Sequence, residues 1–490
     1  MRRDKSLYLL ALVAIMFLVF ITSSITSVEG RKHNVNKGKP HKHQKDKNHK
    51  GNGAPHSSPA PAPLPGYDYY PTGSNIFDVL SFGAKGDGVS DDSKALLAAW
   101  KAACKVPGAT VEIPSEFKFL VKPLTLQGPC MPNLVFQIDG ALLAPPKVGS
   151  WPKSSLFQWI NFKWIHNFTI QGTGVVDGQG SQWWTPSDQI YYIQKKFKHI
   201  PNWKPTSLLC QITILIYFGG PLQALRFYSS YNVTVRDIQI INSPQCHLKF
   251  DSSGGIKVNN LTISSPESSP NTDGIHLQNT RDVEILYSNI GCGDDCVSIQ
   301  TGCSNVHIHH VNCGPGHGIS LGGLGKDKSV ACVSDIVVEK ISLLNTLAGV
   351  RIKTWQGGMG SVKNVSFSNI QVSDVKVPII IDQYYCDKNV CKNQTGAVAI
   401  SGVTYDQIIG TYSVQPVHLA CSNDIPCTDV DLIDIQLKPS LRYRGFHQAL
   451  CWNSYGKSQA PLLPSNIDSC LRRDGGSVKR IARSREHVCF

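Results

Sequence analysis

Residues 232–235 read Asn232-Val-Thr-Val, a polar residue followed by apolar and polar residues in alternation. The same phrase returns along the chain at Asn133-Leu-Val-Phe, Asn167-Phe-Thr-Ile, Asn260-Leu-Thr-Ile, Asp282-Val-Glu-Ile, Asn305-Val-His-Ile, Asp335-Ile-Val-Val and Asn364-Val-Ser-Phe. From Asn232 onward its successive offsets are 28, 22, 23, 30 and 29 residues. Alternation indicates half-buried strands, and a period of about 20 to 30 residues indicates similar units that bury their apolar faces against one another.

The composition agrees with a fold made of strands. Charged residues are 17% of the chain, below the about 25% of an average soluble domain, which disfavours coiled coils and long exposed helices. The helical stretches that an α/β barrel needs between its strands are missing. We therefore predict an all-β fold, a single-stranded parallel β-helix, with an irregular β-sandwich of chance repeats as the alternative.

One amphipathic helix is expected, over Lys94 to Cys104. The residues before it, Ser90-Asp91-Asp92-Ser93, are candidates for its N-cap. Because it precedes the repeats, this helix would cap the open N-terminal end of the stack.

The first thirty residues have the layout of a signal peptide. Arg2, Arg3 and Lys5 precede an apolar run from Leu9 to Ile21, and small and polar residues follow up to Gly30. Thirteen apolar residues are short for a membrane span of about 20, so we expect secretion and no stable membrane insertion, with an uncleaved anchor as the alternative.

A basic linker is expected between this segment and the folded domain. Of a net charge of +13, residues 31–52 carry eight basic side chains and one acidic, and a Ser/Pro/Ala spacer follows at 58–63. We predict a disordered linker over 31–73 and one β-helix domain over 74–490. The linker adheres to an acidic polymer or is a solvated spacer, with metal binding by its histidines as a third alternative, and the secretory context excludes nucleic acid.

The sixteen cysteines, which all lie between Cys104 and Cys489, agree with export. The spacings of Cys296 to Cys313, Cys386 to Cys391 and Cys421 to Cys427 predict short disulfide loops. Five Asn-x-Ser/Thr sequons could accept glycans in the secretory pathway, at Asn167, Asn232, Asn260, Asn364 and Asn393.

Phase counting predicts which polar residues meet. In a β-helix, residues at the same phase of consecutive coils lie about 4.8 Å apart. Asp273 lies 13 residues after Asn260, Asp294 and Asp295 lie 12 and 13 after Asp282, and His317 lies 12 after Asn305. Three carboxylates and one imidazole are therefore expected on one patch.

The next coils add a basic pair and a tyrosine. Arg351 and Lys353 lie 16 and 18 residues after Asp335, and Tyr385 lies 21 after Asn364. Residues two apart share a face of a strand, so Arg351 and Lys353 are expected to hold an acidic substrate together.

Clustered carboxylates repel, so one of them is expected to be protonated while the others stay ionised. Such a set can protonate a leaving oxygen and activate a water, as cleavage of a glycosidic bond requires. The alternative is a calcium site in a lyase that abstracts a C5 proton. His309 and His310 have no matching motif and are interpreted as surface or core residues.

Four short motifs in this order resemble the signatures of the polygalacturonases, glycoside hydrolase family 28. They are Asn271-Thr272-Asp273-Gly274, Gly293-Asp294-Asp295-Cys296, Gly316-His317-Gly318 and Arg351-Ile352-Lys353. The resemblance covers roughly residues 74 to 490. It implies a right-handed parallel β-helix that hydrolyses α-1,4-linked galacturonan with inversion.

By motif position, the resemblance also implies residue roles. Asp294 would be the general acid, Asp273 and Asp295 would activate the water, and His317 would support the acid. Arg351 and Lys353 would bind the galacturonate carboxylate, and Tyr385 and Asn271 would contact the sugar. We expect no cofactor and no metal, and a secreted, monomeric cell wall protein whose partner is pectin.

Three departures from the family pattern stand out. Gly323 replaces the usual Ser, and Cys292 stands where Thr is usual, as a possible free thiol. Residues 207–223 look like an insertion. A noncatalytic pectin-binding wall protein is therefore a further alternative.

Overall fold

Parallel strands dominate the structure, a computed structural model that describes residues 75–147, 150–151, 158–184, 223–386, 391, 394–442, 445, 448–473 and 488–489. They belong to the compact unit that spans Tyr70–Phe490. The predicted signal peptide, the basic linker and residues 207–222 of the predicted insertion lie outside the described residues.

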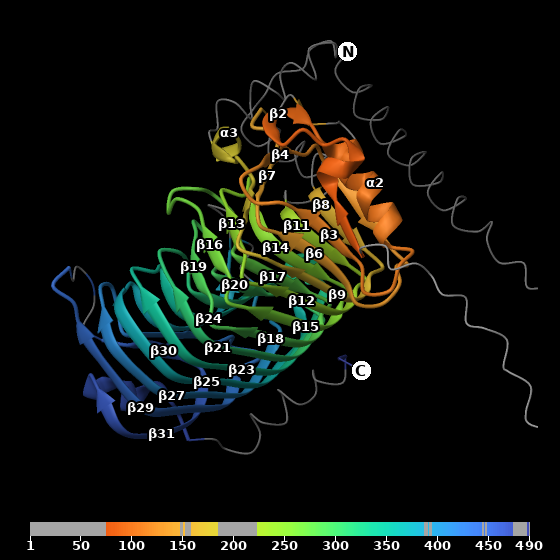
Figure 1. The fold of residues 1–490 in the computed structure, drawn as a ribbon. Helices are drawn as coiled ribbons and strands as arrows, with labels where there is room; N and C mark the ends of the chain where they lie inside the picture. Colours follow the sequence, from red (N-terminus) through yellow and green to blue (C-terminus); the bar gives the residue numbers. More distant parts are fainter. Residues whose placement is uncertain are drawn as a thin grey trace, which may run out of the picture. The chain divides into compact units, whose positions relative to one another are not determined.

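The strands form three ladders that run from coil to coil (Figure 1). The site ladder, named for the residues that it carries, has eleven strands: β5 (Leu124–Gln127), β8 (Gln158–Lys163), β11 (Gln223–Tyr228), β14 (Cys246–Asp251), β17 (Ile275–Gln278), β20 (Val297–Ile299), β22 (Ile319–Leu324), β24 (Ala348–Trp355), β26 (Val377–Tyr385), β28 (Val417–Ala420) and β30 (Leu450–Trp452). Each strand pairs in parallel with the strand of the next coil, as β17 does with β20.

The other two ladders form the second sheet. The long ladder consists of β1 (Ile76–Asp78), β3 (Thr110–Ile113), β6 (Leu134–Ile138), β9 (His166–Gln171), β12 (Tyr231–Arg236), β15 (Gly254–Asn259), β18 (Arg281–Leu286), β21 (Cys303–Cys313), β23 (Val330–Leu344), β25 (Met359–Val375), β27 (Ala399–Tyr412), β29 (Cys427–Pro439) and β31 (Ser454–Leu463). The short ladder consists of β2 (Asp87–Asp91), β4 (Lys118–Leu120), β7 (Ala141–Leu143), β10 (Val175–Asp177), β13 (Gln239–Ile241), β16 (Thr262–Ser264) and β19 (Asn289–Gly291). The two ladders merge at β21, which pairs with both β18 and β19.

The recurring polar residue marks a backbone bend in most long-ladder strands from β12 onward. Asn232, Asp282, Asn305 and Asp335 have φ between 53° and 58°, a left-handed conformation that Asn and Asp tolerate better than most residues. Their side chains also bond between coils, since Asn305 Nδ2 donates to Asp282 Oδ1 over 2.7 Å. The predicted parallel β-helix is therefore confirmed, and the repeat has a conformational cause.

One coil was assigned the wrong phase from the sequence. The register of β12, β15 and β18 gives Gly255, with φ 65°, the place that Asn232 and Asp282 have in their coils. Asn260 lies at the following bend, where its Nδ2 donates to Asp237 Oδ1. Glycine reaches the left-handed region without a polar side chain, so a search for the phrase passed over it.

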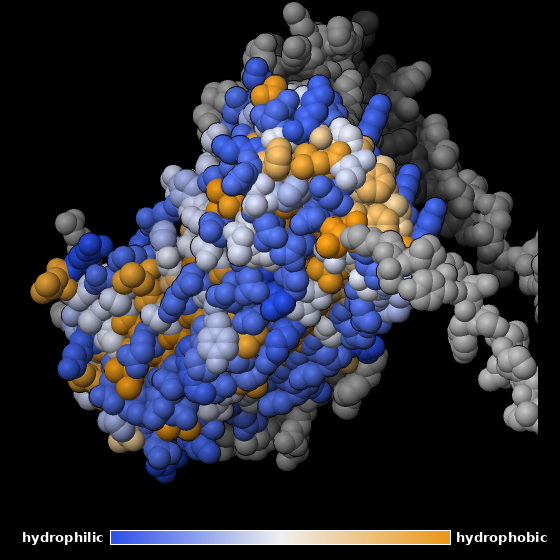
Figure 2. All heavy atoms as spheres, in the orientation of Figure 1, coloured by the Kyte–Doolittle hydropathy of each residue, from blue (hydrophilic) through white to orange (hydrophobic). Residues whose placement is uncertain are grey.

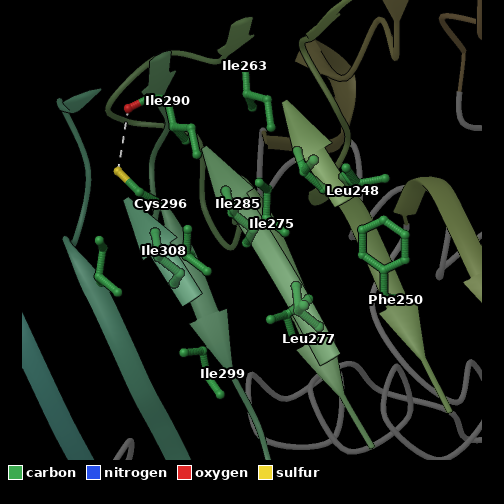
Figure 3. Close-up of a cluster of buried hydrophobic side chains, with 14 of the residues drawn as sticks. Leu248, Phe250, Ile263, Ile275, Leu277, Ile285, Ile290, Cys296, Ile299 and Ile308 are labelled. Atoms are coloured by element: carbon green, nitrogen blue, oxygen red, sulfur yellow. Dashed lines mark hydrogen bonds between the residues drawn. The ribbon is translucent and has the colours of Figure 1, made fainter. Parts of the chain in front are cut away.

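The interior is filled by rows of apolar side chains. Figure 3 shows Leu248 and Ile275 of the site ladder together with Ile285 and Ile308 of the long ladder, and all four are fully buried. Outward positions alternate with these, and Figure 2 shows the face over the long ladder as largely hydrophilic. This alternation holds the site ladder's polar side chains on the outside of a rigid core.

The predicted cap is α2 (Ser93–Ala103), which lies over the first coils (Figure 1). Its Trp100 is buried against Phe136, Phe162 and Phe168, with ring centroids 5.5 to 6.4 Å apart. Asp92 occupies the N-cap position but makes no side-chain cap, because its carboxylate accepts from the backbone of residues 85 and 86. The short helical segments are η1 (Val79–Phe82), α3 (Ser181–Trp184), η4 (Lys326–Lys328) and η5 (Ser465–Cys470).

The three predicted disulfides are present, and three further disulfides join Cys104 to Cys130, Cys332 to Cys489 and Cys451 to Cys470. Among the described residues, Cys246, Cys292 and Cys303 are free and buried, so the unpaired thiol expected at Cys292 is confirmed. The helices in the described part of the chain are all too short or too polar to cross a bilayer.

Candidate active site

Three successive coils bring the predicted acidic residues together on the site ladder. Because Ile275, Val297 and Ile319 are paired in register, the residues two positions earlier, Asp273, Asp295 and His317, occupy equivalent places. Because Asn260 was taken for the residue that starts this coil, where the structure has Gly255, the count began five residues too late. The loop before β17, residues 265–274, is five residues longer than the loop before β20, residues 292–296, and compensates for it.

Asp294 lies beside His317 on this patch. Its Oδ1 is 2.9 Å from His317 Nδ1 and accepts a 2.9 Å hydrogen bond from the backbone N–H of Asp295. One side-chain oxygen or nitrogen from each of the three residues lies within 4.8 Å of the others. Adjacent residues of one strand would face opposite ways, but Asp294 and Asp295 precede β20, and the loop turns both toward the patch.

Asp295 is buried, with 3% of its side chain exposed, and is held by two cations and a hydroxyl. Its Oδ1 accepts from Arg351 Nη2 over 2.6 Å and from Ser320 Oγ over 2.7 Å, and its Oδ2 accepts from Lys353 Nζ over 3.0 Å. Burial opposes ionisation, but the charges of Lys353 and Arg351 outweigh it and lower the pKa of Asp295 to about 2.

The pKa of Asp273 is shifted in the opposite direction to that of Asp295. Burial, followed by the charges of Asp294 and Asp295, raises the pKa of Asp273 well above its usual value. Its Oδ2 lies 3.0 Å from His276 Nδ1. Burial and the nearby charge of Lys249 lower the pKa of His276 to about 3, so this imidazole is neutral and places no positive charge beside Asp273.

Arg351 and Lys353, which we expected to bind substrate, both contact Asp295 in this structure. Lys353 Nζ also lies 5.4 Å from the centroid of the Tyr385 ring, and Tyr385 packs edge-on against Trp355 at 5.3 Å. Asn271 is exposed with φ 55° at the edge of the patch. The substrate-binding roles of these residues stay predictions.

Ser320 and His276 also belong to this patch and were not predicted from the sequence. Each lies three residues after a patch residue, His317 and Asp273, and the two share an outward row of the site ladder with Ser298 and Arg351. Extending the phase count by three residues would have found both, because the same offset recurs in each coil.

The donors of this patch do not fit calcium. Asp294, Asp295 and His317 lie close enough together to hold a metal ion, but both oxygens of Asp295 are already bonded to cationic side chains. Calcium takes six to eight oxygen ligands, and an imidazole is a poor substitute for one of them. The calcium-dependent alternative is therefore not favoured.

The glycine at position 323, where the family usually has Ser, is explained by the backbone conformation there. Gly323 has φ 71°, and β22 changes register against β24 between Gly322 and Leu324. A side chain here would be strained in any residue type, although a Cβ would meet nothing nearer than 3.7 Å, at Gln300 Oε1.

Comparison with known proteins gives consistent matches. The family model described as glycosyl hydrolases family 28 matches residues 104–208 and 221–453. The unmatched residues 209–220 fall inside the predicted insertion, which stays a prediction. A probable polygalacturonase of Arabidopsis thaliana is 37% identical over 84% of this chain and 88% of its own length, and a polygalacturonase of Persea americana is 38% identical over 84% and 81%.

Solved structures share the fold. An exopolygalacturonase of Thermotoga maritima superposes with a TM-score of 0.59 and 19% identity over 74% of this chain and 90% of its own. A polygalacturonase of Erwinia carotovora gives 0.56 and 24% over 74% and 93%.

Proposed function

The chain belongs to the glycosyl hydrolases of family 28, and on this premise we propose that it hydrolyses the α-1,4 bonds of polygalacturonan. The observation that carries the proposal is that the pKa values of Asp273 and Asp295 are shifted in opposite directions, next to the cationic pair Arg351 and Lys353. The raised pKa of Asp273 makes it a stronger base than an ordinary carboxylate, while Asp295 is held anionic by cations that suit a sugar acid.

We assign Asp294 as the general acid. Its proton passes to the glycosidic oxygen as the C1–O bond breaks, and a water adds to C1 and gives a proton to Asp273 or Asp295. Ionised Asp273, with its raised pKa, is the stronger base of the two, while Asp295 is held anionic by its partners. His317, 2.9 Å from Asp294 Oδ1, orients the acid.

The substrate carboxylate would compete with Asp295 for Arg351 and Lys353. Both cations already make charge-assisted bonds to an oxygen pair, so a galacturonate carboxylate offers them an equivalent partner. As they turn toward substrate, their hold on Asp295 weakens and its basicity rises. A methyl ester carries no charge and would not produce this effect, so we propose de-esterified galacturonan as the preferred substrate.

Inversion is proposed from family membership. One oxygen from each of Asp294 and Asp295 lies within 4.8 Å of the other, nearer than the about 6.5 to 9.5 Å that is common in inverting enzymes. This pair therefore does not carry the stereochemical assignment. Proton NMR of the first anomer released tests it directly.

We also propose how the protein reaches the place where it acts. Residues 1–30 direct secretion, the basic linker 31–73 follows, and the domain 74–490 acts in the cell wall as a monomer without a cofactor. The net charge of +7 over residues 31–52 favours retention by acidic pectin.

The test measures reducing ends released from de-esterified galacturonan. Asp294→Asn should lower turnover about 10²- to 10⁴-fold without loss of the fold. Asp406→Asn, on β27 of the long ladder, is the matched control and should retain wild-type turnover. Equal activity of both variants would remove Asp294 from the mechanism, and binding of galacturonan by the wild type without release of reducing ends would identify a noncatalytic wall protein.

A further inference from the structure

Two histidines of β21, His307 and His309, lie on the long ladder, away from the acidic patch of the site ladder. Side chains alternate along a strand, so both project outward while Ile308 between them is buried. Their ring centroids are 4.4 Å apart. The strands β18, β21 and β23 lie side by side (Figure 1), and their register places Glu284 next to His307 and Glu339 next to His309.

The side chains of this group converge. One potential ligand atom from each of Glu284, His307 and His309 lies within 4.8 Å of the other two. His309 Nε2 is 3.5 Å from Glu284 Oε1, and His307 Nε2 is 3.0 Å from Glu339 Oε1. Among the described residues, the one other group of this kind is the acidic patch.

We propose that Glu284, His307 and His309 bind a divalent transition-metal cation, with Zn²⁺ as the representative ion. Two imidazole nitrogens and a carboxylate oxygen are a ligand set that zinc uses in proteins, with a fourth position left for water. Tetrahedral bonds of about 2.0 to 2.1 Å would bring the ligand atoms about 3.4 Å apart. Side-chain rotation supplies this convergence, because His307 and Glu284 are 42% and 37% exposed.

Neighbouring groups orient the ligands. His309 Nδ1 lies 2.8 Å from His310 Nδ1, and when His309 donates its proton there, its Nε2 carries the lone pair that faces Glu284. Glu339 adds a second carboxylate beside His307. A metal held in this way would cross-link two consecutive coils through β18 and β21, and Glu339 of β23, in the next coil, would support His307.

Lys257 would compete with the metal for the carboxylate of Glu284. Its Nζ lies 2.8 Å from Glu284 Oε2 and is half exposed, so it competes for a carboxylate that the cation needs. Removing Lys257 frees Glu284, and the modest strength of an exposed ion pair sets the gain at up to about fivefold in affinity. A structural role of these side chains without metal would not produce such a gain.

The test is calorimetric titration of the full chain with Zn²⁺. The histidines of the linker would also bind the ion, so the background is a full-length variant with each of them replaced by Gln: His33, His41, His43, His49 and His56. We expect one site that His309→Gln weakens at least tenfold and that His310→Gln weakens about tenfold. Lys257→Gln should tighten it.

His166→Gln is the matched control, an exposed histidine on β9 of the same ladder, and should leave the affinity unchanged. Galacturonan hydrolysis should not change at one equivalent of Zn²⁺, because the catalytic residues are on the site ladder. The proposal is overturned if His309→Gln, confirmed as folded by circular dichroism, binds as tightly as the background, if Lys257→Gln binds more weakly, or if His317→Gln abolishes the site instead.

Discussion

Lys353→Met should reveal how strongly the buried cations hold Asp295 in its ionised form. The pKa of Asp295 is lowered from 3.8 to about 2, which corresponds to about 2 kcal/mol in favour of the folded state at neutral pH. Arg351 remains in the variant and keeps part of this. We therefore expect the free energy of unfolding to fall by about 1 to 2 kcal/mol at pH 7.

The pH dependence of this loss has a definite sign. A carboxylate whose pKa is lowered by folding stabilises the protein above its unfolded pKa, and the contribution disappears as the pH falls through the folded value. For Asp295 that window runs from about pH 4 down to about 2, and at pH 3 roughly half of the contribution remains. The difference between wild type and Lys353→Met should therefore shrink by about half from pH 7 to pH 3.

Urea unfolding followed by tryptophan fluorescence at pH 7, 5 and 3 measures both quantities. Lys122→Met is the matched control, because Lys122 Nζ lies 2.9 Å from Asp91 Oδ2 but the two side chains are 48% and 36% exposed. This exposed pair should contribute at most about 1 kcal/mol. Equal losses in the two variants, or a Lys353→Met loss that grows toward pH 3, would refute the electrostatic assignment of Asp295.

Three further outcomes follow from the same structure. Trp100→Ala should destabilise the protein by about 3 to 5 kcal/mol in urea unfolding, because the ring fills the capped end of the core. Galacturonan hydrolysis should continue at its full rate in a chelator without a product absorbing at 235 nm, and loss of activity would restore the lyase interpretation. Because Asp273 must ionise to accept a proton and its pKa is raised, kcat/KM should fall on the acid side well above pH 3.8, and Asp273→Asn should remove that limb of the profile.

The sequence predicted the coil-to-coil proximity because a strand ladder fixes distance by register alone. Asp273, Asp295 and His317 were placed on one patch, and the described structure pairs their strands in register. The phase of one coil was wrong because Gly255 adopts the left-handed conformation of Asn232 without its side chain. Backbone conformation, and not side-chain polarity, is what repeats from coil to coil.

Counting residues from coil to coil could not predict the direction in which each side chain points. The spacing of Arg351 and Lys353 placed both on one outward face, and a substrate carboxylate was their expected partner. In the structure their partner is Asp295, a residue from two coils earlier, because the loop before β20 turns its carboxylate toward the basic row. Ser320, from the intervening coil, donates a hydrogen bond to Asp295 and accepts one from Arg351, with which it is paired in the ladder.

If Arg351 and Lys353 bind the substrate carboxylate as proposed, their contact with Asp295 should make them selective for charged sugars. Before substrate binds, the buried carboxylate of Asp295, with a pKa of about 2, holds Arg351 and Lys353 in place. Little side-chain entropy is then lost when a sugar acid arrives, since the two cations have already been ordered by Asp295. A neutral sugar would leave them on Asp295 and gain nothing from them, so discrimination for charge follows from the exchange of one carboxylate for another.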